Sequence, residues 1–307
     1  YQLHEILAAG GICADQAYFA AQLGKARAVP TLILHGAGND GRHAWFGFLG
    51  PGGKWQLDAG RYAEQRFVTG YARDPQTWGV LSDHELQFLS ERFRALPSYP
   101  QSRVHGDFAA EYLAMGRGAA AGAAARKAVS FEKRNVRAWE TLLAAARHEG
   151  RDARTMENLL REAALAFQRY PDLEARFANR VAASLRARGE TSAAVEEERR
   201  IAAHNRSKRG DLSVQQGREA VRRAMATQPL AEQIRTYNSV VDAYGRGAGI
   251  GFFDEIVVGF AEHLLQLNQK AEALKAVDRA RRTLRVEPKS QLAGEIANLS
   301  QFIRESK

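Results

Sequence analysis

The chain has 307 residues, of which 44 are Lys or Arg and 35 are Asp or Glu, so its formal net charge is +9. Hydrophobic residues make up 45% of it, which is enough for two ordinary buried cores. No apolar run approaches the ~20 residues that a membrane-spanning helix needs, and a single cysteine excludes an intrachain disulfide framework.

The first predicted element is a helix that starts at the single cysteine. Gly10 and Gly11 lead into Cys13, and a helix-compatible run over residues 14–24 follows it. We therefore expect Cys13 at a helix N-terminus, where the partial positive charge favours a thiolate over a thiol. Small residues recur at helical spacing between residues 17 and 24, which predicts that this helix packs closely against a sheet.

Three short strand-like runs follow, at residues 29–34, 43–49 and 54–58. The sequence GPGG at residues 50–53 predicts a hairpin turn between the second run and the third. A turn centred near Pro51 would put Asp58 opposite Trp45, on the same face as His43 and about 7–8 Å from it along the diagonal. A register slip of one residue would place the histidine and the aspartate on opposite faces.

Cys13, His43 and Asp58 have the residue types that thiol chemistry requires. A nucleophilic cysteine needs a base that takes its proton and a third polar group that orients the base. Taken singly, each residue also has a structural interpretation. Cys13 could be a small buried hydrophobic residue, His43 a strand-end residue bonded to backbone, and Asp58 a turn residue that accepts backbone N–H groups. Together the three form the candidate catalytic set.

These motifs resemble the core of the transglutaminase-like superfamily, whose fold is similar to that of papain-type cysteine peptidases. The resemblance covers roughly residues 5–62 and is carried by GGIC at residues 10–13, HAW at 43–45 and LD at 57–58. It implies Cys13 as the nucleophile, His43 as the general base and acid, and Asp58 as the residue that orients the imidazole. It also implies acyl transfer through a thioester, with water or an amine as the acceptor.

In that superfamily a segment before the cysteine often supplies a Trp or Gln side chain to the oxyanion hole. Here Gln2 is the sole such side chain, so we expect that this form lacks an N-terminal part upstream of Tyr1. The oxyanion hole then depends on the backbone N–H of Cys13 and an unidentified partner. No signal peptide is present, and a single catalytic cysteine is compatible with an exported bacterial protein, periplasmic or extracellular, whose leader lies upstream.

Polar and aromatic side chains after the predicted core could contact a substrate. Residues 69–78 are predicted to form a loop. This loop either overhangs a cleft and contacts the substrate, or is a surface loop held in place by Trp78. Trp45 is either pocket wall or core. The candidate substrate-binding set is Trp45, Arg61, Tyr62, Tyr71 and Arg73.

The remaining motifs are interpreted as structural features of the fold and not as binding or catalytic sites. Residues 245–251 (GRGAGIG) resemble a phosphate-binding loop, but no strand precedes them and no Lys-Ser/Thr pair ends them, so we interpret them as a connector. Residues 35–41 are interpreted as the loop that leads to His43. Residues 82–85 (SDHE) have capping-box spacing before a helix over 86–96, which makes His84 a first-turn residue. No spacing suggests a metal ligand set, and no cofactor is expected.

After residue 97 the chain is rich in Ala, Arg, Glu and Leu at helical spacing as far as Lys307. Helix breaks at intervals predict stacked helical hairpins, and residues 188–194 and 267–273 faintly resemble tetratricopeptide repeats. The predicted fold class is α+β. A papain-like or transglutaminase-like core, with a helix packed on a small antiparallel sheet, occupies residues 1–97, and an all-α, solenoid-like domain of helical hairpins occupies residues 98–307.

The net charge lies in the helical part, because residues 1–100 contain nine basic and nine acidic residues. The leading hypothesis is a cysteine-dependent acyl-transfer enzyme that acts on amide bonds of a protein or peptide-like polymer, with hydrolysis slightly favoured over amine transfer. In this hypothesis the helical domain holds the substrate or a protein partner. The alternative is a non-catalytic scaffold for protein interaction. A third hypothesis, binding of nucleic acid or another polyanion, lacks a recognisable reader motif, and we do not expect nucleic acid as the partner.

Overall fold

The computed structural model of the chain describes residues 2–38, 41–61, 68–205 and 210–306. The residues group into two compact units, which we call unit 1 (Tyr1–Ser82 with Asn205–Lys307) and unit 2 (Asp83–His204). The predicted domains, residues 1–97 and 98–307, meet where strand-like sequence changes to helical sequence. The compact units have other boundaries, because the C-terminal helices pack with the N-terminal sheet and belong to the same unit.

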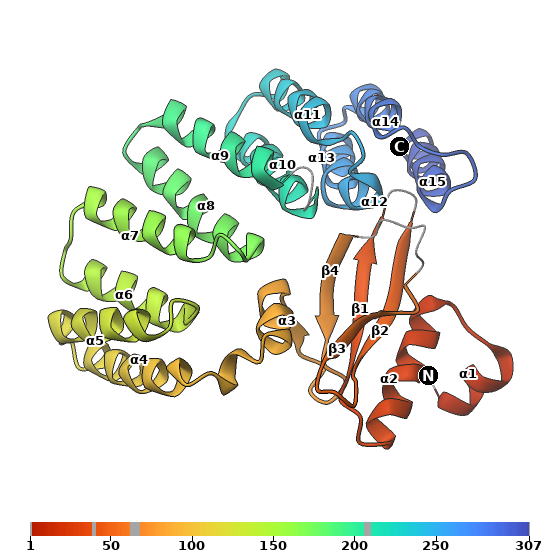
Figure 1. Cartoon of the computed structure of the whole chain (residues 1–307). Helices are drawn as coiled ribbons and strands as arrows, with labels where there is room; N and C mark the ends of the chain where they lie inside the picture. The colour runs from red at the N-terminus through yellow and green to blue at the C-terminus, as the bar shows by residue number, and fades with distance from the viewer. Residues whose placement is uncertain (1, 39–40, 62–67, 206–209, 307) are drawn as a thin grey trace. The chain divides into compact units, whose positions relative to one another are not determined.

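The N-terminal part of unit 1 is a small antiparallel sheet with a helix packed on it (Figure 1). Within the described residues the strand order is β3-β2-β1-β4-β5, and every neighbouring pair is antiparallel. The elements in chain order are α1 (Leu3–Ala9), α2 (Cys13–Ala26), β1 (Thr31–Ala37), β2 (Arg42–Leu49), β3 (Trp55–Ala59), β4 (Val68–Arg73) and β5 (Val80–Leu81). The predicted first helix and the three predicted strands are therefore confirmed, and the papain-like identity of this core stays a prediction.

Small side chains let α2 lie close to the sheet, as predicted. Ala17 and Ala21 pack against Ile33 and Ala44 of the two central strands. The hydroxyl of Thr31 donates a hydrogen bond of 2.9 Å to the backbone carbonyl of Ala21. This close packing fixes the start of α2 relative to β1 and β2.

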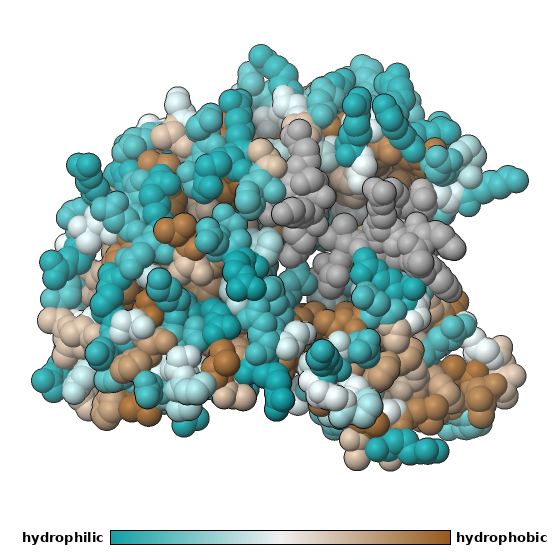
Figure 2. All heavy atoms as spheres, in the orientation of Figure 1, coloured by the Kyte–Doolittle hydropathy of each residue, from teal (hydrophilic) through white to brown (hydrophobic). Residues whose placement is uncertain are grey.

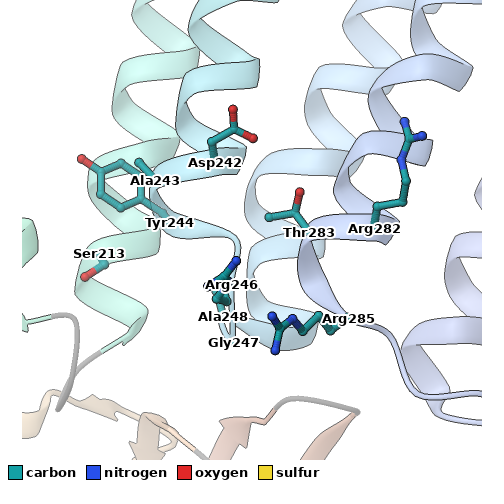
Figure 3. Close-up of a pocket in the computed structure, with 10 residues that line it drawn as sticks. All are labelled: Ser213, Asp242, Ala243, Tyr244, Arg246, Gly247, Ala248, Arg282, Thr283 and Arg285. Carbon is teal, nitrogen blue, oxygen red and sulfur yellow. The ribbon is translucent and has the colours of Figure 1, made fainter.

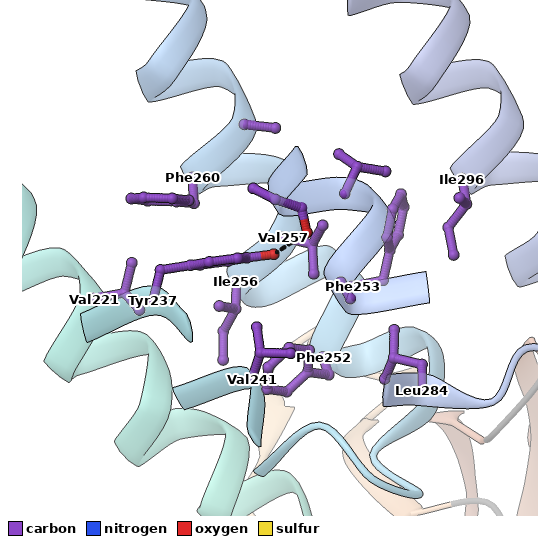
Figure 4. Packing of buried hydrophobic residues seen from close by; sticks show 14 of the residues in the cluster. Val221, Tyr237, Val241, Phe252, Phe253, Ile256, Val257, Phe260, Leu284 and Ile296 are labelled. Carbon is purple, nitrogen blue, oxygen red and sulfur yellow. Dashed lines mark hydrogen bonds between the residues drawn. The ribbon is translucent and has the colours of Figure 1, made fainter. Parts of the chain in front are cut away.

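The C-terminal part of unit 1 is helical and has the largest apolar core of the unit. Its elements are α10 (Gly210–Thr227), α11 (Leu230–Tyr244), α12 (Gly249–Phe252), a π-helix (Phe253–Val258), α13 (Gly259–Gln266), α14 (Lys270–Leu284) and α15 (Gln291–Glu305). The rings of Tyr237 and Phe260 stack with their centroids 4.2 Å apart, and the Tyr237 hydroxyl donates to the carbonyl of Ala276 at 3.0 Å (Figure 4). Burial raises the pKa of Tyr237 well above its ordinary value.

Backbone contacts join these helices to the sheet. The N–H of Ile250 donates to the carbonyl of Gly38 at 3.1 Å, and the N–H of Arg42 donates to the side-chain oxygen of Gln291 at 3.1 Å. A Cβ atom added at Gly251 would lie 3.6 Å from the Cβ atom of Ala37, so the two backbones are near van der Waals contact. The end of the sheet and the C-terminal helices therefore form one packed body.

Unit 2 consists of short helices joined by tight turns (Figure 1). In chain order they are α3 (Asp83–Ser90), a 3-10 turn (Phe93–Ala95), α4 (Ser98–Ala114), α5 (Gly118–Phe131), α6 (Val136–His148), α7 (Ala153–Ala166), α8 (Pro171–Ala187) and α9 (Thr191–Asn205). The predicted helix over 86–96 is wrong in extent. Arg92 takes a left-handed conformation with φ 51°, which ends the helical path before the 3-10 turn.

The hairpins of unit 2 recur at a regular interval. The starts of α5 and α7 are 35 residues apart, as are those of α6 and α8, close to the 34 residues of a tetratricopeptide repeat. Ion pairs span a similar interval of 36 residues, since Arg126 pairs with Glu162 at 2.7 Å and Arg176 pairs with Glu140 at 2.7 Å. The predicted helical hairpins are confirmed.

One partly buried pair fixes α3 against α8. Both the backbone N–H and Nδ1 of His84 lie within hydrogen-bond distance of Oδ2 of Asp172, at 3.2 and 2.6 Å. Burial alone would raise the pKa of the Asp172 carboxyl, but the hydrogen bond from the His84 ring and its charge outweigh burial and hold that pKa below its ordinary value. The predicted first-turn position of His84 is confirmed, and its side chain holds two helices together.

The surface is mixed in character. Figure 2 shows mainly hydrophilic residues on the visible face of the described helices, with hydrophobic residues scattered among them. No helix in the described part of the chain combines the length and the apolar composition that crossing a membrane requires.

The first prediction concerns the apolar core of the C-terminal helices, which Figure 4 shows. Phe260 is 1% exposed, so replacing it with Ala should lower the free energy of unfolding by about 3–5 kcal/mol through lost burial and a residual cavity. Phe302 on α15 is 58% exposed, and Phe302→Ala should change that free energy by no more than about 0.5 kcal/mol. Denaturation by guanidinium chloride, followed by circular dichroism, measures both. Equal losses in the two variants would contradict the assignment of this core.

Candidate functional site

A cavity of about 710 Å³ lies where the end of the sheet meets the C-terminal helices of unit 1. The first residues of α2 and residues of β1, β2 and β4 line one side, and residues of α10, the π-helix and α15 line the other. The polar or reactive side chains on the side of the sheet and α2 are Cys13, His35, Arg42, His43 and Tyr71, and those on the side of the C-terminal helices are Asp211, Gln215, Arg218, Glu255 and Gln291. We call this the thiol cavity.

Cys13 is the first residue of α2, as predicted, and its thiol is free and partly buried. The start of the helix is fixed by Asp15, whose carboxylate accepts a hydrogen bond of 2.9 Å from the backbone N–H of Ile12. Gly11 allows this turn, since a Cβ atom there would lie 2.5 Å from the Cβ atom of Asp15. The sulfur therefore lies at the positive end of a 14-residue helix, in the wall of the cavity.

His43 is buried in β2, with 6% of its surface exposed. Its Nε2 atom lies 2.9 Å from the carbonyl oxygen of Gly60, and a carbonyl can only accept, so Nε2 carries a proton. In the neutral ring Nδ1 is then the basic nitrogen. The ring stacks on Trp45, whose indole N–H donates to the carbonyl of Leu57 at 2.7 Å.

The predicted contact between Asp58 and His43 is not formed. Phe46 lies opposite Ala59 and Phe48 opposite Gln56, with a bulge between the two pairs, so the prediction that Asp58 lies opposite Trp45 is wrong. The Asp58 side chain is 74% exposed and pairs with Arg61 at 2.9 Å. One contact of the imidazole is thus a backbone carbonyl, and the Asp58 carboxylate lies outside the lining of the cavity.

The faces of the sheet separate the two histidines of the cavity. Directly paired residues of neighbouring strands share a face. His35 pairs with Ala44, which packs under α2, whereas His43 pairs with Gly36 on the other face, together with Trp45. His35 therefore shares its face with the helix that begins at Cys13, and His43 reaches the cavity from the opposite face.

His35 is a site residue that the sequence motifs do not predict. The glycines of residues 35–41 favour a loop, but β1 continues to Ala37. Extending the strand alternation by two residues would have placed His35 on the face of Ile33. The ring stacks on Tyr71 at 4.9 Å. Burial, and then the positive charge of Arg73, lower the pKa of His35, so its ring is neutral at pH 7.

The candidate substrate-binding residues have different surroundings. Tyr71 lines the cavity, and the guanidinium group of Arg73 lies 5.4 Å from the centre of its ring. Trp45 is 1% exposed and belongs to the core, and Arg61 lies over its ring at 5.5 Å. Tyr62 falls outside the described residues. Of this set, Tyr71 is the one placed in the cavity lining.

Arg42, the residue before His43, connects the two sides of the cavity. Its guanidinium group pairs with Asp254 of the π-helix at 2.5 Å and with Glu295 of α15 at 2.6 Å. Hydrogen bonds from this group, opposed by burial, lower the pKa of Glu295. The next residue of the π-helix, Glu255, pairs with Arg218 of α10. Local sequence patterns do not predict the ion pairs of Arg42, because Asp254 and Glu295 lie more than 200 residues away from it in the sequence.

Among the described residues, no group of three or more His, Cys, Asp or Glu side chains is arranged to hold a metal ion.

Comparisons with known proteins do not assign a family. No family model matches the chain. No curated protein matches it either. A solved structure of the P58(IPK) TPR domain is 14% identical over 72% of this chain and 60% of that one, with a TM-score of 0.22. The chain therefore spans less than two thirds of that neighbour, and a TM-score of this size supports no conclusion on fold or function.

The ion pairs of Arg42 give the second prediction. Arg42→Met should lower the free energy of unfolding by about 1 kcal/mol at pH 7, since the pairs are partly exposed. Because the pKa of Glu295 is lowered in the folded state, its contribution is present above the ordinary Glu pKa of about 4.3 and is lost as pH falls through the lowered value. The difference between variant and parent should therefore shrink below about pH 4.

Urea denaturation at pH 7 and pH 3.5 measures this difference. Arg27→Met is the matched control, because Arg27 has no carboxylate partner among the residues that the structure describes. If Arg42→Met lowered the free energy of unfolding by the same amount at both pH values, the result would contradict the role of the ion pairs.

Proposed function

We propose that unit 1 is a cysteine-dependent acyl-transfer enzyme that acts on amide bonds of a protein or peptide-like polymer. The observation that carries the proposal is the free thiol of Cys13 at a helix N-terminus in the wall of a cavity that two histidines also line. A thiol, a base and space for a substrate are the minimum for nucleophilic catalysis by cysteine.

The proposed steps follow from these groups. A neutral imidazole takes the proton of the thiol, and the thiolate attacks the carbonyl carbon of the amide. The imidazolium returns the proton to the leaving amine as the C–N bond breaks, which leaves a thioester on Cys13. Water, deprotonated by the same imidazole, then releases a carboxylate and restores the thiol. We favour hydrolysis over amine transfer because transfer needs an acceptor site, and no residue of the cavity marks one.

Two histidines compete for the role of base. The transglutaminase-like resemblance implies His43, whose Nδ1 is the basic nitrogen of the neutral ring. The sheet pairing favours His35, which shares the face of α2 and is neutral at pH 7. Replacing each histidine in turn distinguishes the two.

A second candidate function is a scaffold for protein interaction. It is favoured by the regular hairpins of unit 2 and by the exposed position of Asp58, which leaves the implied triad without its carboxylate. Cys13→Ala separates the candidates, because a scaffold keeps its cellular phenotype when the thiol is removed and an enzyme loses it.

Thiol reactivity is the third prediction. Alkylation of Cys13 by iodoacetamide should already be fast below pH 7 in the parent protein, because a paired imidazolium stabilises the thiolate. In the variant that lacks the base, either His43→Ala or His35→Ala, the rate should follow an ordinary cysteine with a midpoint at about pH 8.5. Mass spectrometry of the single thiol against time measures the rate.

His4→Ala is the matched control, since His4 lies on α1 and is exposed. Parent-like profiles in both cavity variants, or an ordinary profile in the parent protein, would count against the enzyme and favour the scaffold.

Asp58 gives the fourth prediction. Because its carboxylate is exposed and pairs with Arg61, Asp58→Asn should leave the pH profile of Cys13 alkylation unchanged within about twofold. The triad implied by the resemblance predicts instead that the reactivity below pH 7 is lost. The same alkylation assay decides between the two, and a loss would mean that Asp58 reaches the imidazole in the working enzyme.

A further inference from the structure

A second cavity of unit 1, of about 690 Å³, is lined by arginines. It lies between α10, the loop from α11 to α12, and the end of α14 (Figure 3). Its charged lining residues are Arg246, Arg282, Arg285 and Asp242. We call it the arginine pocket.

The positive charge of this pocket is not balanced by the protein. None of its three guanidinium groups has a carboxylate partner within the part of the chain that the structure describes. The lining carboxylate, Asp242, is already paired with Arg279 at 2.5 Å. By contrast, Arg42 and Arg218 of unit 1 are paired with acidic side chains. All three arginines are exposed, and their like charges give the pocket a positive potential that attracts anions.

Local backbone geometry fixes two of the arginines at the pocket. Arg246 follows Gly245, where a Cβ atom would lie 2.6 Å from the carbonyl oxygen of Val241, so only glycine fits. Gly247 has φ 73°, a conformation that favours glycine. Arg285 ends α14 in the left-handed region with φ 54°. Figure 3 shows its guanidinium group turned toward the loop of Arg246, whereas Arg282 points away from that loop.

We propose that the arginine pocket binds the anionic group of a ligand, a phosphate or a carboxylate. Guanidinium groups suit both, because their planar N–H donors make two parallel hydrogen bonds to an oxyanion. Arg246 and Arg285 are the principal donors. The hydroxyl of Thr283 does not serve as a donor, since it already donates to the carbonyl of Arg279 at 3.1 Å.

The arginine pocket adjoins the thiol cavity. Ala248 lines both, and consecutive residues of α10 divide between them, Ser213 in the arginine pocket and Val214 in the thiol cavity. A ligand that extends from the arginine pocket past Ala248 would enter the thiol cavity. The anion site itself does not depend on Cys13 being a nucleophile, so the two proposals can fail separately.

Isothermal titration of the full chain with inorganic pyrophosphate and with citrate, at constant ionic strength, tests the site. Saturable binding of either probe is expected. Arg246→Gln and Arg285→Gln should each weaken it by about tenfold, as expected for loss of charge-assisted hydrogen bonds. Arg281→Gln is the matched control, because Arg281 is a neighbouring exposed arginine of α14 that does not line the pocket.

The probes also distinguish the source of the anion. Preference for pyrophosphate supports a phosphate-bearing ligand, and preference for citrate supports a polycarboxylate. Thermal melting of the variants without probe shows whether they are folded. Equal weakening in Arg281→Gln, or binding that never saturates, would mean general attraction to a basic surface and would overturn the proposal.

Discussion

The ion pairs of Arg42 are the interaction on which the candidate site depends. They join the strand that carries His43 to the π-helix and to α15, across more than 200 residues of sequence. Together with the hydrogen bonds from Ile250 to Gly38 and from Arg42 to Gln291, these pairs hold the two walls of the thiol cavity together, because α10, the π-helix and α15 supply the wall opposite the sheet. Two neighbouring acidic residues of the π-helix face different partners, Asp254 toward Arg42 and Glu255 toward Arg218. Ion pairs thus connect the π-helix both to the sheet and to α10.

Local signals in the sequence predicted α2, most of the first three strands and the helical hairpins, but they missed β4 and the geometry of the site. The start of α2 at Cys13 follows from the glycines before it and the small residues after it, and both are local. The position of Asp58 depends on a bulge between Phe46 and Phe48, which no turn signal specifies. His35 was assigned to a loop because glycines follow it, although the central strand of a sheet tolerates them here. The partners of Arg42 are set by tertiary packing alone.

A carbonyl in place of a carboxylate changes what His43 can do. The oxygen of Gly60 fixes the tautomer and the orientation of the ring as a carboxylate would. A carbonyl has only a partial charge, however, so it stabilises an imidazolium less than an aspartate does. His35 has a different limitation, because burial and Arg73 both disfavour its charged form. His35 would therefore be a weaker partner for a thiolate than the base of a complete triad.

The arginines of the neighbouring arginine pocket affect the stability of the charged thiolate and imidazolium. A thiolate and an imidazolium need electrostatic support, and the pocket that shares Ala248 with the thiol cavity carries positive charge. Positive charge favours a thiolate and disfavours an imidazolium. An anion bound at Arg246 and Arg285 would reduce that field and ease protonation of the histidine. If the two cavities serve one ligand, its anionic group would act both as an anchor and as a counter-charge for the proton transfer that the thiol requires.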